Sequence, residues 1–177
     1  IFRDGLRQPL DLVVKVPRQA ISESEVRVLN REHRQIREQL GDIVPITVFA
    51  RTTIDDQPSM IAMAPNIRRW FDVANPIHED EIKPLIGQSD RLRQALRHFV
   101  DAAEHWYATE HKVIDLYGRD NLIFDRNRHL HYIDSFSVFF YADLLSVLPD
   151  PEPGLVERIR ISRERLGYLH HLLGDDA

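Results

Sequence analysis

Asn121 and Asp134 stand at the two ends of a stretch that reads NLIFDRNRHLHYID. Two short apolar runs, separated by the polar residues 125–128, predict a β-hairpin with those four residues as its turn. Closing the hairpin would bring Asn121 and Asp134 together at its open end. An amide oxygen and a carboxylate that converge there are hard oxygen ligands, which suit Mg²⁺.

The pair resembles the metal-binding residues of protein kinases, an Asn of the catalytic loop and the Asp of the D-F-G motif. Residues 10–16, LDLVVKV, resemble the kinase strand V-A-I-K and place Lys15 at its lysine position. Glu32 lies in a helical pattern farther along the chain. In kinases the glutamate that pairs with this lysine also lies on a helix. The resemblance implies that Lys15, held by Glu32, binds the α- and β-phosphates of ATP, and that Asn121 and Asp134 bind Mg²⁺.

The predicted catalytic loop departs from the family pattern in one position. Kinases have their base Asp five residues before the loop Asn, and Leu116 stands there in this chain. Asp115, one residue farther away, is the candidate that would orient or deprotonate the acceptor hydroxyl. The D-F-G motif is also changed, because Asp134-Ser135-Phe136 keeps the metal ligand and lacks the glycine that gives the backbone its freedom to flip. We therefore expect a fixed site rather than a switching one.

Strand and helix signals supply elements that could position these residues. Residues 1–3, 10–17, 45–52 and 58–64 are predicted strands. Helices are predicted over 23–40, 90–110 and 154–173, the first with a capping box of Ser22 and Glu25 and the second with Ser89 as its N-cap. Pro76 and Pro84 are expected to break any long helix between 68 and 87.

The resemblance also implies a hinge over residues 62–66. Backbone groups of Ala62, Ala64 and Asn66 would bind the adenine ring there. Residues 1–3 look like the end of a strand and Asp4-Gly5 like the start of a turn, so a glycine-rich loop that covers the phosphates would lie upstream of residue 1 or be absent.

The expected fold class is α+β: a reduced, two-lobed protein-kinase-like fold. Residues 1–66 would form the N-lobe, an antiparallel sheet with one helix, and residues 67–177 a reduced and mostly helical C-lobe. Little chain follows Asp134, and no activation segment or A-P-E motif is present. The architecture resembles small bacterial kinase-like proteins near the PhoP-regulatory-network family.

Composition narrows the function classes. The net charge of −5 gives no general basic field for nucleic acid, and the chain has no cysteine for disulfides or thiolate metal sites. No apolar run is long enough to predict a membrane span, and a cytoplasmic location is expected. His129 and His131 share one strand face, but no third metal ligand is obvious in the sequence, so a solvated hairpin tip is the favoured interpretation.

Three function classes follow. The preferred one is a phosphotransferase that uses Mg²⁺ and ATP, with a protein or small-molecule hydroxyl as acceptor. Leu116 and the missing activation segment favour a pseudokinase, which would bind partners or nucleotide without phosphoryl transfer. An interaction domain without a nucleotide site is the third, favoured because no glycine-rich loop is visible in the sequence.

Overall fold

The structure is a computed structural model that describes residues 11–17, 22–134, 136, 138–147 and 154–175. The strands are β1 Leu12–Lys15, β2 Val48–Ile54, β3 Gln57–Pro65, β4 Arg69–Asp72, β5 Lys112–Ile114, β6 Leu122–Asp125, β7 Leu130–Tyr132 and β8 Phe139–Tyr141. The helices are α1 Glu23–Leu40, α2 Glu79–Gln88, α3 Asp90–Glu110, α4 Leu144–Val147 and α5 Leu155–Leu173, with 3₁₀ turns at Gly41–Ile43 and Pro76–His78. The predicted strand at 1–3 and the turn at Asp4-Gly5 lie outside the described residues.

Helix α1 begins where the capping box predicts. The Ser22 side chain accepts a hydrogen bond from the Glu25 N–H at 3.3 Å, and the Glu25 carboxylate accepts one from the Ser22 N–H at 2.7 Å. Two of the unsatisfied donors at the helix start are thereby used. The last helical hydrogen bond runs from the Gly41 N–H to the Arg37 carbonyl, and the positive φ of 56° at Gly41 then turns the chain out of the helix. The predicted range of 23–40 is confirmed.

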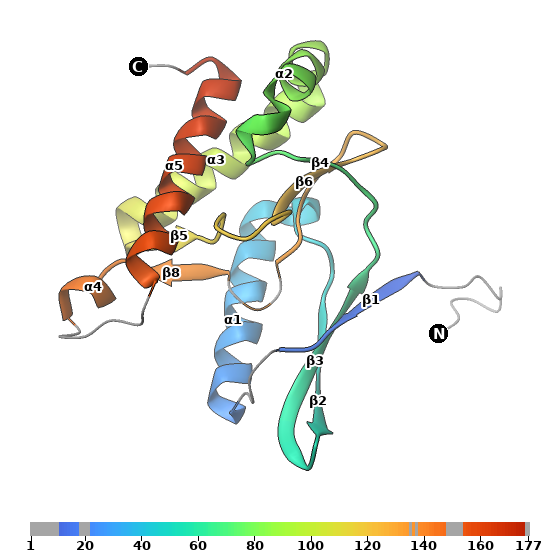
Figure 1. Ribbon diagram of the computed structural model, residues 1–177, viewed down its shortest axis with the longest axis vertical. Coiled ribbons are helices and arrows are strands. Elements are labelled where there is room, and N and C mark those ends of the chain that lie inside the picture. Colours follow the sequence, from blue (N-terminus) through green and yellow to red (C-terminus); the bar gives the residue numbers. More distant parts are fainter. Residues whose placement is uncertain (1–10, 18–21, 135, 137, 148–153, 176–177) are drawn as a thin grey trace.

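The first sheet has the antiparallel order β1-β3-β2, with β3 in the centre. Register pairs Lys15 of β1 with Ala62 of β3, and Phe49 of β2 with the same Ala62. Lys15 and Val13 share a face, because side chains alternate along a strand. The sheet stands beside α1 in the lower half of Figure 1, with β1 at its edge.

Strands β6 and β7 form the predicted hairpin, and β4 pairs with the outer side of β6. Leu122 is opposite Tyr132, and the Ile133 N–H donates to the Asn121 carbonyl at 2.8 Å just beyond the paired strands. The hairpin prediction is confirmed, and its open end holds Asn121 next to residues 133 and 134. Strands β5 and β8, which the sequence did not predict, form a separate two-stranded sheet.

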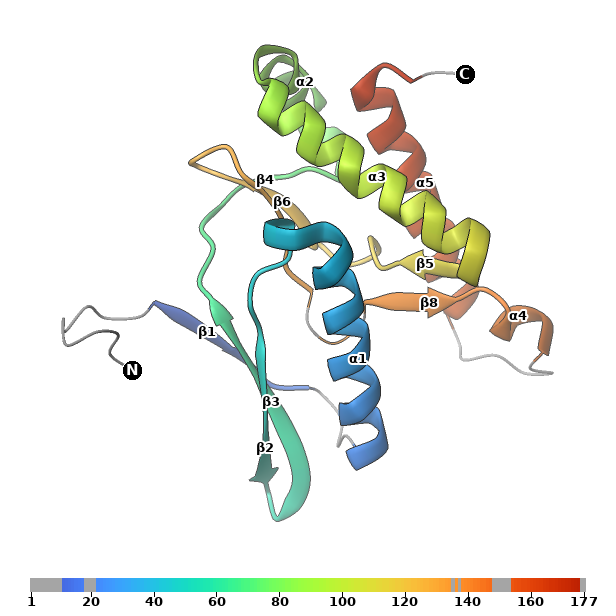
Figure 2. The same cartoon turned by 180° about the vertical axis from the view of Figure 1, so that it is seen from behind.

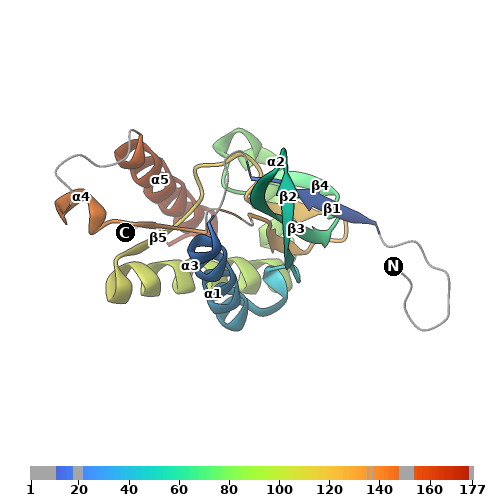
Figure 3. The ribbon, with the colours of Figure 1, turned by 90° about the horizontal axis from the view of Figure 1, so that it is seen from below.

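The helices of the second half pack around α3. Figures 1 and 2 show α2 and α5 alongside α3, with the β4-β6-β7 sheet between these helices and α1. The core includes Phe99 and Leu96 of α3, Leu169 of α5 and Ile36 of α1, so the end of α1 shares the core of the helical part. In Figure 3, which views the molecule from below, the β1-β3-β2 sheet lies apart from helices α3 and α5.

Pro84 lies inside α2, so the prediction that it breaks the helix is wrong. A proline in a helix interior removes one backbone hydrogen bond. Ile82 and Ile86, on either side of it, are buried in the core and compensate by hydrophobic burial.

The α+β class is confirmed by helices that pack beside small antiparallel sheets. The boundary between residues 66 and 67 stays a prediction. Within the described part of the chain, no helix combines the length and the apolar character that crossing a bilayer requires.

Candidate functional site

Asn121 and Asp134 meet as the hairpin predicted. The Asn121 side-chain amide donates to the Asp134 carboxylate at 3.2 Å and to the Asp115 carbonyl at 3.1 Å. The second Asp134 oxygen accepts from the Phe136 N–H at 3.0 Å. A Cβ at Gly118 would lie 2.7, 2.8 and 3.0 Å from atoms of the Asn121 side chain. Glycine at 118 therefore leaves room for Asn121 in this orientation, and a larger residue there would displace the Asn121 side chain.

Lys15 reaches the same place from β1. Its ammonium donates to the Ile133 carbonyl at 2.5 Å, and the neighbouring Asp134 carboxylate attracts it. Burial lowers the pKa of Lys15, and the negative charge of Asp134 opposes that shift. Three of the residues chosen from the sequence thus converge: a cation, a carboxylate and an amide.

Asp115 is buried behind this group, with 6% of its surface exposed. One carboxylate oxygen accepts from the N–H groups of Tyr117 and Gly118 at 2.8 and 3.4 Å. Burial and, secondly, the negative charge of Asp134 raise the pKa of Asp115 to about 7. A carboxyl group with a pKa near neutrality is suited to general acid–base chemistry.

Helix α5 holds the loop that carries Asp115. Ser162 accepts from the Leu116 N–H at 3.1 Å, and the Arg165 guanidinium donates to the carbonyls of Leu116, Tyr117 and Gly118. These bonds satisfy polar groups that the turn leaves without backbone partners. Sequence patterns place Ser162 and Arg165 on a helix but do not reveal this contact.

Glu32 has a different partner from the one the resemblance implies. Its buried carboxylate accepts a hydrogen bond from the Tyr141 hydroxyl of β8. Among the described residues no ion pair joins Glu32 to Lys15, whose ammonium donates to the Ile133 carbonyl. Tyr141 could not be identified beforehand, because its strand lies far from α1 in the sequence.

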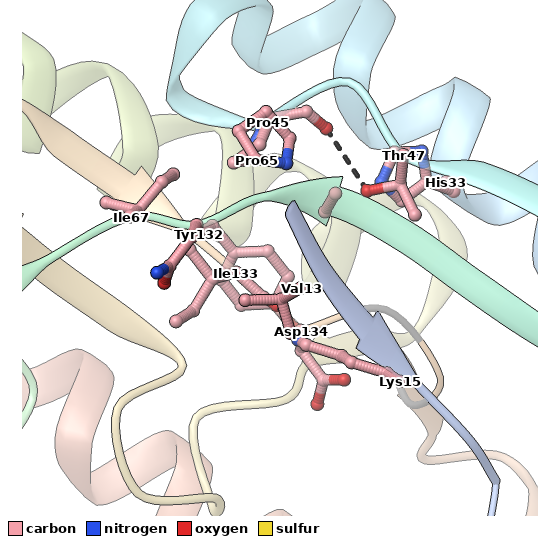
Figure 4. A pocket seen from close by; sticks show the side chains of 12 residues that line it. Val13, Lys15, His33, Pro45, Thr47, Pro65, Ile67, Tyr132, Ile133 and Asp134 are labelled. Carbon is pink, nitrogen blue, oxygen red and sulfur yellow. Dashed lines mark hydrogen bonds between the residues drawn. The ribbon is translucent and has the colours of Figure 1, made fainter. Parts of the chain in front are cut away.

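A cavity opens beside Lys15 and Asp134. Figure 4 shows these two side chains together at one end of the lining, with Pro45 and Pro65 toward the other. The lining is mostly apolar and includes Val13, His33, Thr47, Ala64, Asn66, Ile67, Tyr132 and Ile133. An apolar pocket with charged groups at one end is the usual form of a site for a small polar ligand.

The strand register changes the predicted adenine contacts. The Asn66 N–H donates to the Asp11 carbonyl at 2.9 Å, so the backbone of Asn66 faces β1. In an antiparallel pair the direction of the backbone groups repeats every second residue. The N–H and C=O groups of Ala64 and Ala62 therefore also face β1, where these residues pair with Val13 and Lys15. The hinge prediction is therefore not supported at Ala62, Ala64 and Asn66, although Ala64 and Asn66 do line the cavity.

Pro65, the last residue of β3, and Ile67, just beyond the strand, also line the cavity. Strand β2 begins opposite Met63, so it does not extend to cover Pro65. Among the described residues, none accepts a hydrogen bond from the Ile67 N–H. These two residues are the better candidates for backbone contacts to a bound ring.

Comparison of the chain with protein-family models, with curated proteins and with solved structures found no match in any of the three. The site itself is therefore the basis for a function. Its groups could neutralise an anionic ligand, hold a hard divalent cation and exchange a proton near neutral pH.

Proposed function

We propose that this protein binds ATP with Mg²⁺ in a kinase-like site and transfers the terminal phosphoryl group to a hydroxyl acceptor. The observation that carries the proposal is the convergence of Lys15, Asn121 and Asp134 at the charged end of an apolar cavity. Lys15 lies far in the sequence from the hairpin whose open end holds Asn121 and Asp134, and the family resemblance names the same three residues. The sheet order β1-β3-β2 supports it by placing the lysine strand next to the strand that leads into the cavity lining.

The site offers ligands that suit Mg²⁺. The Asn121 amide nitrogen donates to both the Asp115 carbonyl and the Asp134 carboxylate, which leaves the amide oxygen as the ligand atom. Together with the Asp134 carboxylate it supplies the hard oxygens that Mg²⁺ selects. Bound there, Mg²⁺ would neutralise charge on the β- and γ-phosphates.

Each remaining residue has one role in this proposal. Lys15 binds the α- and β-phosphates, and to do so it gives up its hydrogen bond to the Ile133 carbonyl. The acceptor oxygen forms a bond to the γ-phosphorus as the bond to the β-phosphate oxygen breaks, so ADP leaves. Asp115 receives the proton of the acceptor hydroxyl. The adenine ring bonds the Pro65 carbonyl and the Ile67 N–H at the other end of the cavity.

A second candidate is a pseudokinase that binds nucleotide without transfer. The observation in its favour is the position of Asp115, which is buried and fixed by two backbone N–H groups one residue away from the family's base position. An interaction domain without a nucleotide site remains the third candidate, and it predicts no nucleotide binding that depends on Mg²⁺.

Thermal unfolding with and without Mg-ATP tests for the nucleotide site. Nucleotide at about one hundred times its dissociation constant adds roughly 2.7 kcal/mol to the native state. We expect a rise in the midpoint that requires Mg²⁺ and disappears in Asp134→Asn. The matched control is Asp56→Asn in the exposed β2–β3 turn, where the φ of 59° is one that Asn tolerates. Absence of any shift in the wild type would leave only the interaction domain.

Asp115→Asn then separates the two nucleotide-binding candidates. The asparagine keeps an oxygen for the Tyr117 and Gly118 N–H groups but cannot take a proton from the acceptor. A phosphotransferase should lose phosphoryl transfer in this variant and retain the Mg-ATP thermal shift. Equal turnover in wild type and variant would remove Asp115 from the mechanism, and binding without turnover in the wild type would identify a pseudokinase.

A further inference from the structure

A second group of chemically active side chains lies at the turn of the β6–β7 hairpin. Asp125 ends β6, His129 precedes β7, and His131 lies within β7. One oxygen of Asp125 lies 3.4 Å from Nδ1 of His129 and 3.3 Å from Nε2 of His131. The sequence offered no third ligand beside the two histidines, and the structure supplies Asp125.

The fold prepares the Asp125 carboxylate for this position. Its other oxygen accepts from the N–H groups of Asn127 and His129 at 2.9 and 2.8 Å, so only the oxygen that faces the histidines remains for another partner. Arg91 of α3 donates to the carbonyls of Asn127 and Arg128 and ties the turn to the helix. Such supporting hydrogen bonds hold a ligand set in place before an ion arrives.

The distances fit a tetrahedral metal ion. Bonds of about 2.0–2.1 Å from Zn²⁺ to nitrogen and oxygen place neighbouring ligand atoms roughly 3.3 Å apart. Both distances from Asp125 to the histidine nitrogens have this length, and all three ligand atoms lie within 4.8 Å of one another. A small rotation of the exposed His129 side chain would close the third edge.

We propose that Asp125, His129 and His131 bind a divalent transition-metal ion of the Zn²⁺ type. Two imidazole nitrogens and one carboxylate oxygen leave a fourth position for water or an exogenous ligand. That position is open to solvent, because His129 is exposed and His131 lines two surface hollows. Mg²⁺ is disfavoured here because it selects oxygen ligands.

The metal site does not rest on the proposed function. It lies at the turn of the hairpin, whereas Asn121 and Asp134 lie at the open end of the same two strands. An ion on Nε2 of His131 would replace the contact of that nitrogen with Asp125, and the buried Nδ1, which has no hydrogen-bond partner among the described residues, would carry the ring proton. The competing explanation is a local Asp–His hydrogen-bond network that only closes the turn.

Calorimetric titration of the untagged protein with Zn²⁺, and optical titration with Co²⁺, decide between these explanations. We expect one site, with the visible absorption of tetrahedral Co²⁺, and at least a tenfold loss of affinity in His129→Gln. The exposure of His129 makes this variant the one that should fold, while His131→Asn gives a second test. The control is His105→Gln on the exposed face of α3, which should bind as the wild type does.

Asp134→Asn should also bind Zn²⁺ normally, which separates this site from the Mg-ATP site. Failure of the wild type to bind Zn²⁺, or equal affinity in the wild type and both histidine variants, would overturn the proposal. Loss of Mg-ATP binding with retained Zn²⁺ binding would leave the metal site intact, and the reverse result would leave only the nucleotide site.

Discussion

His33 of α1 should make the protein sensitive to mild acid. Its side chain lines the cavity, its ring meets Phe49 edge-on at 5.4 Å, and only 5% of its surface is exposed. Burial, followed by the positive charges of Arg37 and Lys15, lowers the pKa of His33 from 6.5 to about 4. The folded protein therefore keeps this imidazole neutral at pH values where the unfolded chain protonates it.

The sign of the effect follows from proton binding. Below the unfolded pKa of 6.5 the unfolded chain binds more protons at this residue, so stability falls with falling pH until the folded pKa of about 4 is reached. Between about pH 7 and about pH 5 the loss from this single group is roughly 2 kcal/mol, at about 1.4 kcal/mol for each pH unit below the unfolded pKa. Removing the titrating group should remove that part of the pH dependence.

His33→Phe is the variant of choice because it keeps a ring next to Phe49. Urea unfolding, followed by tryptophan fluorescence at several pH values, gives the free energy of unfolding of variant and wild type. We expect the wild type to lose roughly 2 kcal/mol more than the variant over that pH range. His105→Phe, at an exposed position of α3, should follow the wild type. Parallel curves for His33→Phe and wild type would refute the assignment of a neutral buried imidazole.

Three further changes test the loop and its supports. Gly118→Ala should push the Asn121 side chain away from Asp134, weaken Mg-ATP binding about tenfold in thermal-shift titrations and cost about 1 kcal/mol in urea unfolding. Tyr141→Phe should lower the free energy of unfolding by roughly 1.5–3 kcal/mol, because the buried carboxylate of Glu32 loses its donor. Arg165→Met should cost roughly 1–3 kcal/mol and speed amide exchange in the loop, since three carbonyls lose their donor.

Each of these changes has a control elsewhere in the chain. Gly87→Ala adds a Cβ that meets nothing within 4 Å, so it should leave Mg-ATP binding unchanged. Tyr117→Phe removes a hydroxyl from an exposed side chain, and Arg160→Met removes an exposed cation of α5. A control that behaved like its test variant would contradict the contact assigned to that variant.

Local signals were enough to predict the long helices and the hairpin. The capping box at Ser22 and Glu25 and the N-cap at Ser89 mark helix starts that the structure confirms. The turn at 125–128 has the polar composition that reverses a chain, and it brought Asn121 and Asp134 within hydrogen-bond distance. These features depend on neighbours in the sequence, which is why they could be predicted.

Contacts between distant segments could not be predicted in the same way. Strand β8 is short and pairs with β5, so its sequence has no alternation that marks it as a strand. The bond from Tyr141 to Glu32 depends on that pairing and on how α1 packs beside it. The direction of the backbone at Asn66 likewise depends on register with β1, which residue types alone do not fix.

The position of Arg165 has a consequence for the order in which the molecule matures. The loop from Asp115 to Asn121 is synthesised roughly 45–50 residues before Arg165, whose guanidinium holds the loop carbonyls. At ribosomal rates of about 5–20 residues per second, that interval lasts on the order of a few seconds. During it the nascent chain has the residues of the proposed nucleotide site without the helix that fixes their backbone. The protein should therefore acquire its ligand only after α5 has left the ribosome and docked.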